Sequence, residues 1–409
     1  MKNKILLSIA ALFISIPFLY ARDVDATKYK RSSIYSFMLE RPDKRMATEI
    51  RLAFLKMDTP DKYNNHNLSV RYVIFPKDKK QDEERISNYL QTNQVAKRMV
   101  AKWFNRQKEN GAFDMALVGE RGMYNASVLE KQLAERTIRG AAALSDAGEE
   151  LVANTFVLVN DISYIDKQEN ADIAAQVFGT IASVVGSLFG AGNIGNLIKA
   201  TAQLAQAISK MVAGFTVKTT TYLYKLEWND EIAATFYQNY YYEQSNIDLE
   251  KKKAFEADST LFKLSYIGKY SASSQKTVMR GLYEPADVFR KVCTRAIDKN
   301  VMELQKKYDV FKVKVPITEV SNVIKAPIGL KEGISSSSKF EVLETKTDAN
   351  GRTRYNRVGI IRPVEGKIWD NRYMSEAEGS RDAKLGYTVF EKESSTSNFY
   401  AGMLIREIK

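Results

Sequence analysis

The stretches TFVLVNDISYI at Thr155–Ile165 and FTVKTTTYLYKLEW at 215–228 carry the strongest strand signals in this 409-residue chain. Both are rich in β-branched and aromatic residues, which favour extended backbone. A continuous apolar segment separates them, and such an insertion returns the chain near the point where it left. We therefore expect the two stretches to be antiparallel neighbours in one sheet.

The sequence on either side of these stretches predicts an α/β domain over residues 22–325. Upstream, strand-like and helical patterns alternate, which is typical of a sheet layered with helices. Downstream we expect a short helix directly after 228, then one more strand and one long helix. The expected strands are 33–38, 68–75, 113–118 and 261–270, and the expected helices are 44–57, 84–107, 127–151 and 286–308.

Residues 326–409 have a different character. Short apolar stretches occur at 340–343, 355–361 and 387–391, and Asp-Ala-Asn-Gly at 348–351 is typical of a hairpin turn. The pattern predicts a small all-β, SH3-like barrel of about five strands.

Residues 1–21 have the pattern of a signal peptide. Lys2 and Lys4 precede an almost wholly apolar run at 5–19, and Ala21 is a small residue at a plausible cleavage point. No cysteine directly follows this apolar run, where a lipid anchor would be attached. We therefore expect an exported protein, periplasmic or associated with the outer membrane, without a lipid anchor.

The composition argues against several classes of enzyme. The chain has a single histidine, His66, and a single cysteine, Cys293. A Ser-His-Asp triad would need His66, which we expect on a surface loop, and a zinc site would have only these two residues to draw on. One cysteine also excludes an intrachain disulfide. We expect no catalytic residues and no metal.

Basic charge does not by itself indicate nucleic acid here. The formal net charge is +12, but lysines and arginines are interspersed with acids along the chain. Interspersed charge is typical of a solvated surface, and export favours lipid headgroups, envelope polymers or an acidic protein over nucleic acid. We expect no nucleic-acid partner.

The sequence Gly-Ala-Gly-Asn-Ile-Gly at 190–195 matches the G-x-G-x-x-G dinucleotide fingerprint. That motif needs a preceding strand and an acid about twenty residues later. Residues 173–189 instead have helical spacing, and the first acid after Gly195 is Glu227. We therefore expect no nicotinamide cofactor.

The region 171–213 is better described as a helical hairpin. Residues 173–198 contain no charge, and small residues recur every four positions, which lets helices approach closely. We expect helices at 171–189 and 196–213, buried within the protein or an oligomer, or else inserted into a membrane or a partner. The candidate contact residues are Gly179, Ile181, Ser183, Val185, Gly186, Leu188, Phe189 and Gly190.

Parts of the chain resemble known envelope proteins. Two stretches resemble the α/β core of curli-secretion CsgG-like proteins. One is the alanine-rich stretch that runs into 156–159, and the other is 222–228 followed by Asn-Asp-Glu-Ile at 229–232. The C-terminal residues are similar to the SH3-like end domains of flagellar-assembly envelope proteins, at Gly329, Gly333, 340–343 and 358–364. The resemblance implies an envelope-assembly or scaffold role and brings no catalytic or binding residue with it.

These observations favour a non-enzymatic, exported cell-envelope protein that binds a protein partner or itself, with membrane contact through 171–213 as an open alternative. A second hypothesis is a secreted hydrolase that uses two carboxylates on a surface polymer, with the tyrosine-rich stretch 237–242 as its sugar-binding surface. A third is a membrane-inserting, pore-type protein.

Overall fold

The computed structural model describes residues 30, 32–76, 82–125, 150–165, 216–275, 285–347 and 353–408. The predicted signal peptide at 1–21 and the predicted helical hairpin at 171–213 lie outside these residues. Both stay predictions.

The first sheet has six strands in the described part of the chain, in the order β2-β1-β4-β5-β6, with β3 also paired to β1. β1 runs parallel to β2, β3 and β4, whereas β4, β5 and β6 are antiparallel. The expected antiparallel pairing of the two strongest strands, β4 and β5, is confirmed. The strands are β1 (Ser32–Glu40), β2 (Tyr63–Asn65), β3 (Tyr72–Ile74), β4 (Thr155–Ile165), β5 (Thr216–Leu226) and β6 (Leu264–Gln275).

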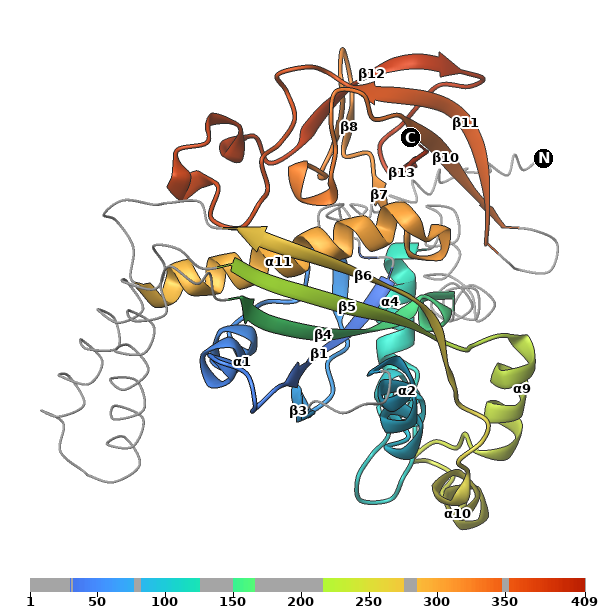
Figure 1. The fold of residues 1–409 in the computed structure, drawn as a ribbon. Coiled ribbons are helices and arrows are strands. Elements are labelled where there is room, and N and C mark those ends of the chain that lie inside the picture. The colour runs from blue at the N-terminus through green and yellow to red at the C-terminus, as the bar shows by residue number, and fades with distance from the viewer. Residues whose placement is uncertain are drawn as a thin grey trace, which may run out of the picture.

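Helices cover both faces of this sheet, which confirms the predicted α/β layering. α1 (Ala47–Leu55) and α11 (Pro285–Lys307) pack on one face, and α2 (Asp82–Thr92) and α3 (Val95–Trp103) on the other (Figure 1). Because successive strand residues point to opposite faces, Phe156 and Leu158 of β4 pack in the α11 layer, while Val157 and Val159 pack in the α2–α3 layer.

Two predicted elements upstream of β4 were wrong. The single helix expected at 84–107 is two helices, because the chain turns at Gln94, which has the left-handed φ of 48°. The strand expected at 113–118 is absent: Phe113 lies in a loop and α4 (Ala116–Asn125) follows it. Its apolar run marks burial, since Phe113 packs in an aromatic cluster.

A smaller aromatic core lies beside the sheet. It joins the end of α3 to α9 (Asp230–Asn239) and α10 (Leu249–Ala257), the latter absent from our prediction. Asn229 and Asp248 cap these two helices through their side-chain oxygens. The buried rings are Trp103, Phe104, Phe113, Trp228, Phe236, Phe255 and Phe262.

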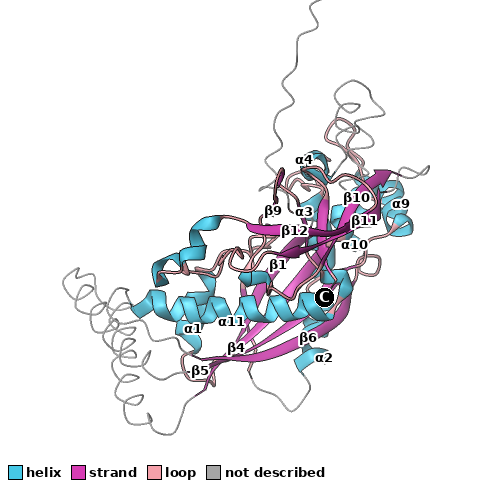
Figure 2. Cartoon of the chain, turned by 90° about the horizontal axis from the view of Figure 1, so that it is seen from above, coloured by secondary structure: helices cyan, strands magenta, loops and turns pink. Residues whose placement is uncertain are grey.

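The C-terminal residues form a second, antiparallel sheet that is curled into a half-barrel (Figures 1 and 2). Its order is β7-β13-β10-β11-β12-β9-β8, and it begins at Lys314, upstream of residue 326. Irregular registers at Val342/Leu343 and Ile360/Ile361 add local twist. The strands are β7 (Lys314–Pro316), β8 (Glu319–Val320), β9 (Ile324–Ala326), β10 (Phe340–Thr347), β11 (Thr353–Pro363), β12 (Thr388–Ser395) and β13 (Leu404–Glu407).

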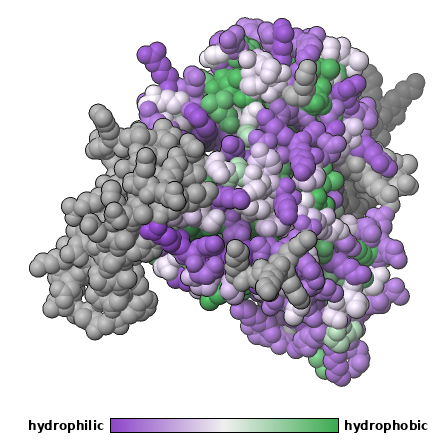
Figure 3. Space-filling model, viewed as in Figure 1, coloured by the Kyte–Doolittle hydropathy of each residue, from purple (hydrophilic) through white to green (hydrophobic). Residues whose placement is uncertain are grey.

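α11 lies between the two sheets (Figure 1). Its apolar side, with Val292, Ile297 and Leu304, packs on the first sheet. Its other side faces the C-terminal region, where the short 3-10 turns are η3 (Asp309–Phe311), η4 (Leu330–Glu332), η5 (Glu376–Glu378) and η6 (Arg381–Leu385). On the face seen in Figure 3, the described residues are mostly hydrophilic, with apolar residues in separate groups.

Candidate functional site

The predicted contact residues, Gly179 to Gly190, lie outside the described residues, but the structure describes where their segment is attached. Ile165, the last residue of β4, pairs with Thr216, the first residue of β5. Residues 166–215 therefore leave and re-enter the sheet at adjacent positions, as the sequence predicted. They are held by ten consecutive antiparallel residue pairs, from Phe156↔Lys225 to Ile165↔Thr216.

A buried arginine ties together the strand ends next to this attachment. Arg41 directly follows β1, and its side chain is only 6% exposed. Its Nη2 lies 2.8 Å from Asp161 Oδ2 on β4 and 2.8 Å from Asp82 Oδ2 at the start of α2. Its Nη1 donates to the Phe75 carbonyl. Burial alone would lower the pKa of Arg41, but the hydrogen bonds and charges of Asp161 and Asp82 outweigh it and raise the pKa.

Below α11, buried amides connect the strands of the first sheet. Asn160 donates to Ser36 Oγ (3.0 Å), and its Oδ1 accepts from Thr221 (2.9 Å). Asn300 of α11 donates to Thr221 Oγ1 (3.1 Å) and to the Thr219 carbonyl (2.9 Å). Since unpaired polar groups are costly in a core, these bonds select one placement of α11 over the sheet.

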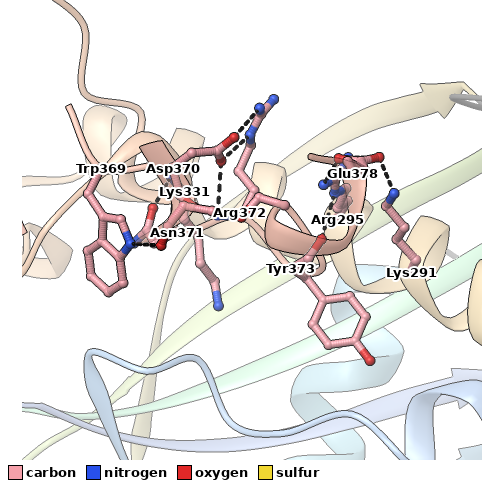
Figure 4. Close-up of polar contacts among 11 residues, drawn as sticks. Lys291, Arg295, Lys331, Trp369, Asp370, Asn371, Arg372, Tyr373 and Glu378 are labelled. Carbon is pink, nitrogen blue, oxygen red and sulfur yellow. Dashed lines mark hydrogen bonds and ion pairs between the residues drawn. The ribbon is translucent and has the colours of Figure 1, made fainter. Parts of the chain in front are cut away.

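An acidic side chain joins α11 to the C-terminal region (Figure 4). Both oxygens of Glu378 accept from Arg295, at 3.2 and 2.6 Å, and Lys291 forms a further ion pair with it. Arg295 also donates to the Tyr373 carbonyl (3.1 Å). Burial would raise the pKa of Glu378, but the two cations outweigh it and lower the pKa.

The stretch Trp369-Asp370-Asn371 lies at the same junction, by which we mean the contacts between the first domain, α11 included, and the C-terminal region (Figure 4). Asp370 is held by Arg372 at 2.8 Å, which lowers its pKa to about 2. Asn371 accepts from the Lys331 backbone N–H (2.8 Å). Trp369 is partly buried, donates to the Ala383 carbonyl and has the Lys62 ammonium 5.5 Å from its ring centroid. It thus links the two regions instead of filling the core of the half-barrel.

A buried carboxylate lies at the same junction. Asp298 of α11 is 12% exposed, its Oδ1 lies 3.7 Å from the Lys331 ammonium, and its Oδ2 has no hydrogen-bond partner among the described residues. Burial raises the pKa of Asp298 to about 6, although Lys331 opposes the shift. The adjacent cavity, about 10 Å³, is large enough for one water at most.

Replacing Asp298 with asparagine is expected to stabilise the protein at pH 8 by about 2 kcal/mol. Because the pKa of Asp298 is raised in the folded state, that state favours the protonated carboxyl. As pH rises through about 6 this carboxyl ionises, and the unsubstituted protein loses the stability that the protonated form gives it. The advantage of D298N should therefore vanish near pH 4. Urea unfolding at several pH values measures it. Asp61→Asn, which removes the exposed partner of the same lysine, is the matched control, and an equal pH trend in both variants would contradict the assignment.

The catalytic groups considered from the sequence are buried. His66 is 0% exposed, which corrects the surface-loop expectation: its ring stacks on Trp103 with centroids 5.1 Å apart, and Nε2 bonds to the Met99 carbonyl. Burial lowers the pKa of His66 to about 3 and raises that of Cys293 to about 12. No group of three or more His, Cys, Asp and Glu side chains is placed to hold a metal in the described ranges.

The tyrosine-rich stretch packs against the aromatic core. Tyr242 is buried and donates to the Asn110 carbonyl (2.7 Å). Tyr237 and Tyr241 are partly buried against Phe104, with ring centroids about 6 Å apart. The run is aromatic because α9 must pack on α3 and α10.

No protein-family model and no curated protein matches this chain. Among the helices that the structure describes, none is both long enough and apolar enough to cross a bilayer. The junction and the Arg41 cluster are therefore interpreted from their geometry alone.

Proposed function

We propose that this chain is a non-enzymatic, exported cell-envelope protein with an assembly, scaffold or partner-binding role. In this proposal residues 171–213 form an apolar helical hairpin that mediates self-association or membrane contact. The C-terminal half-barrel, as an SH3-like domain, binds a protein partner. The observation that carries the proposal is the pairing of Ile165 with Thr216, which attaches the segment 166–215, uncharged over 173–198, to the end of the first sheet.

The attachment is suited to transmitting force or position. The Arg41 cluster joins β1, β4 and α2 at Asp161, four residues before the end of β4. The amides of Asn160 and Asn300 fix α11, and α11 in turn holds Glu378 of the C-terminal region. A segment bound to lipid or to another copy would thus be connected through buried polar contacts to the half-barrel. Such a connection is what a scaffold with two docking regions requires.

The test is a variant in which Asn-Gly replaces residues 166–215. Because Ile165 and Thr216 are direct antiparallel partners, a two-residue turn closes this hairpin without changing its register. We expect the variant to fold, to lose self-association in light scattering, and to move from the membrane pellet to the soluble fraction after alkaline carbonate extraction.

A second variant keeps the length of the segment and changes its chemistry. Val185→Glu with Leu188→Glu places two charges in the uncharged stretch and should shift the protein in the same direction as the deletion. The matched control is Val310→Glu, at an exposed apolar residue far from 166–215 in sequence. A deletion variant with unchanged oligomeric state and unchanged fractionation would overturn the proposal.

A further inference from the structure

A cleft of about 480 Å³ lies on the first domain. Residues at the end of α2 and the start of α3 line one side, and the segment 258–264, which follows α10, lines the other. Its volume falls within the range of small-molecule binding sites. Neither the junction nor the attachment of 166–215 shares a residue with it.

One side of the cleft is apolar, and packing against the aromatic core holds it in place. Leu90 of α2 and Leu264 of β6 line it together with Phe262. Phe262 packs against Phe255 and Phe236, with ring centroids 5.9 and 6.1 Å apart, so its position is fixed by the aromatic core. This side offers a preformed surface to the C–H groups of a ligand.

Lys97 holds the far wall in place. It is almost fully buried, and its ammonium donates to the carbonyls of Glu256 (3.0 Å) and Asp258 (2.7 Å) while lying 4.9 Å from the Phe255 ring centroid. Asp258 in turn accepts from the backbone N–H groups of Thr260 and Leu261. Lys97 thus supports the wall instead of serving as a free cation.

The lining side chains without a hydrogen-bond partner among the described residues include two neutral amides, one carboxylate oxygen and the Lys263 ammonium. Glu227 Oε1 accepts from Ser265 Oγ (2.5 Å), while Oε2 accepts no bond from the described residues. The side-chain amides of Gln91 and Gln94 line the cleft and have no hydrogen-bond partner within those same residues. Gln94 keeps this position with a left-handed backbone, a conformation costly for a residue other than glycine.

We propose that this cleft binds a neutral carbohydrate. Amides and a carboxylate oxygen can each engage hydroxyl groups, which are at once donors and acceptors. Leu90, Phe262 and Leu264 complement the apolar face of a sugar ring. The ionisable side chains that line the cleft, Lys97, Glu227, Asp258 and Lys263, carry balanced formal charge, so the lining favours neither a polyanion nor a cation. The proposal is independent of the role of residues 166–215.

Calorimetric titration of the full chain with cellohexaose, xylohexaose, mannohexaose and chitohexaose tests the proposal. We expect at least one of these probes to bind. Gln91→Ala and Glu227→Gln should each weaken that binding about ten-fold, the effect of losing one well-placed hydrogen bond. Gln91 is exposed on α2 and alanine favours helix, so Gln91→Ala should fold normally.

Gln238→Ala, at an exposed glutamine of α9 outside the cleft, is the matched control and should leave binding unchanged. Lack of binding by all four probes at millimolar concentration would overturn the proposal. So would binding that Gln91→Ala and Glu227→Gln do not weaken, or tighter binding of polygalacturonate or trialanine, which would assign the cleft to an acidic polymer or a peptide.

Discussion

Replacing Trp103 with alanine is expected to lower the free energy of unfolding by about 4 kcal/mol. Trp103 is 0% exposed, and its indole N–H donates to Thr155 Oγ1 at 2.9 Å. His66 stacks on its ring, and the Arg121 guanidinium carbon lies 4.3 Å from the ring centroid. Alanine would leave a large cavity and remove the aromatic partner of both. Since most domains are stable by only about 5–15 kcal/mol, this single change should bring the fold close to its limit.

Urea unfolding followed by far-ultraviolet circular dichroism measures this effect. Trp103→Phe keeps a ring but loses the hydrogen bond to Thr155, so it should cost about 1–2 kcal/mol. Tyr400→Ala, at an aromatic residue that is 50% exposed, is the surface control and should change stability by less than about 0.5 kcal/mol. A loss below about 1 kcal/mol in Trp103→Ala would show that Trp103 does not support the α2–α3 layer.

The elements predicted correctly are those in which the pattern of apolar residues matches the side chains that the structure buries. β4 alternates between two buried faces, and its eleven residues were expected at the positions where the structure has them. α11 has an apolar stripe along its length and was expected within one residue at either end. In these elements local pattern and tertiary packing agree, so a single sequence is sufficient.

The elements that were missed depend on tertiary contacts. The apolar pattern continues through Gln94, because α2 and α3 pack on the same face of the sheet, and only the left-handed backbone there separates them. Phe113 resembles a strand residue because a loop can be as apolar as a strand when an aromatic core covers it. The seven-stranded order of the C-terminal sheet involves β7 and β8, which are too short to give an alternating signal.

The polar clusters could not be found from sequence spacing. Arg41, Asp82 and Asp161 are far apart in the chain and meet only because β1 and β4 are parallel neighbours and α2 starts beside them. The same holds for Asp298 and Lys331, and for Gln91 and Glu227 in the cleft. The antiparallel pairing of β4 and β5 was predictable, because both have strong strand signals and the insertion between them returns the chain near the point where it left.

Replacing Arg41 with methionine is the second change with a large expected effect, a loss of about 3 kcal/mol. Methionine fills much of the same volume but leaves Asp82 and Asp161 without the cation that both contact at 2.8 Å. Removing one partner of a buried ion pair costs more than the pair contributes, because the remaining charges, here carboxylates that are 30% and 21% exposed, stay partly desolvated. The Phe75 carbonyl would also lose its donor.

Arg41→Lys should recover part of this loss, since it restores the charge but not the two-armed contact with Asp161. Arg362→Met is the matched control: Arg362 pairs with Glu391 at 2.8 Å, but both side chains are more than half exposed, so its loss should cost about 1 kcal/mol or less. Combining Arg41→Met with Asp161→Asn should give a loss smaller than the sum of the two, because both remove the same interaction.

The position of Arg41 gives this prediction a second readout. Because the cluster lies beside the strand ends from which residues 166–215 depart, Arg41→Met should accelerate hydrogen exchange in 159–165 and 216–221 more than in β10 or β11 of the other sheet. Exchange that rises equally in both sheets would mean that Arg41 contributes only to global stability. Exchange confined to the strand ends would mean that the chain uses a buried ion cluster to keep the attachment of its apolar segment rigid.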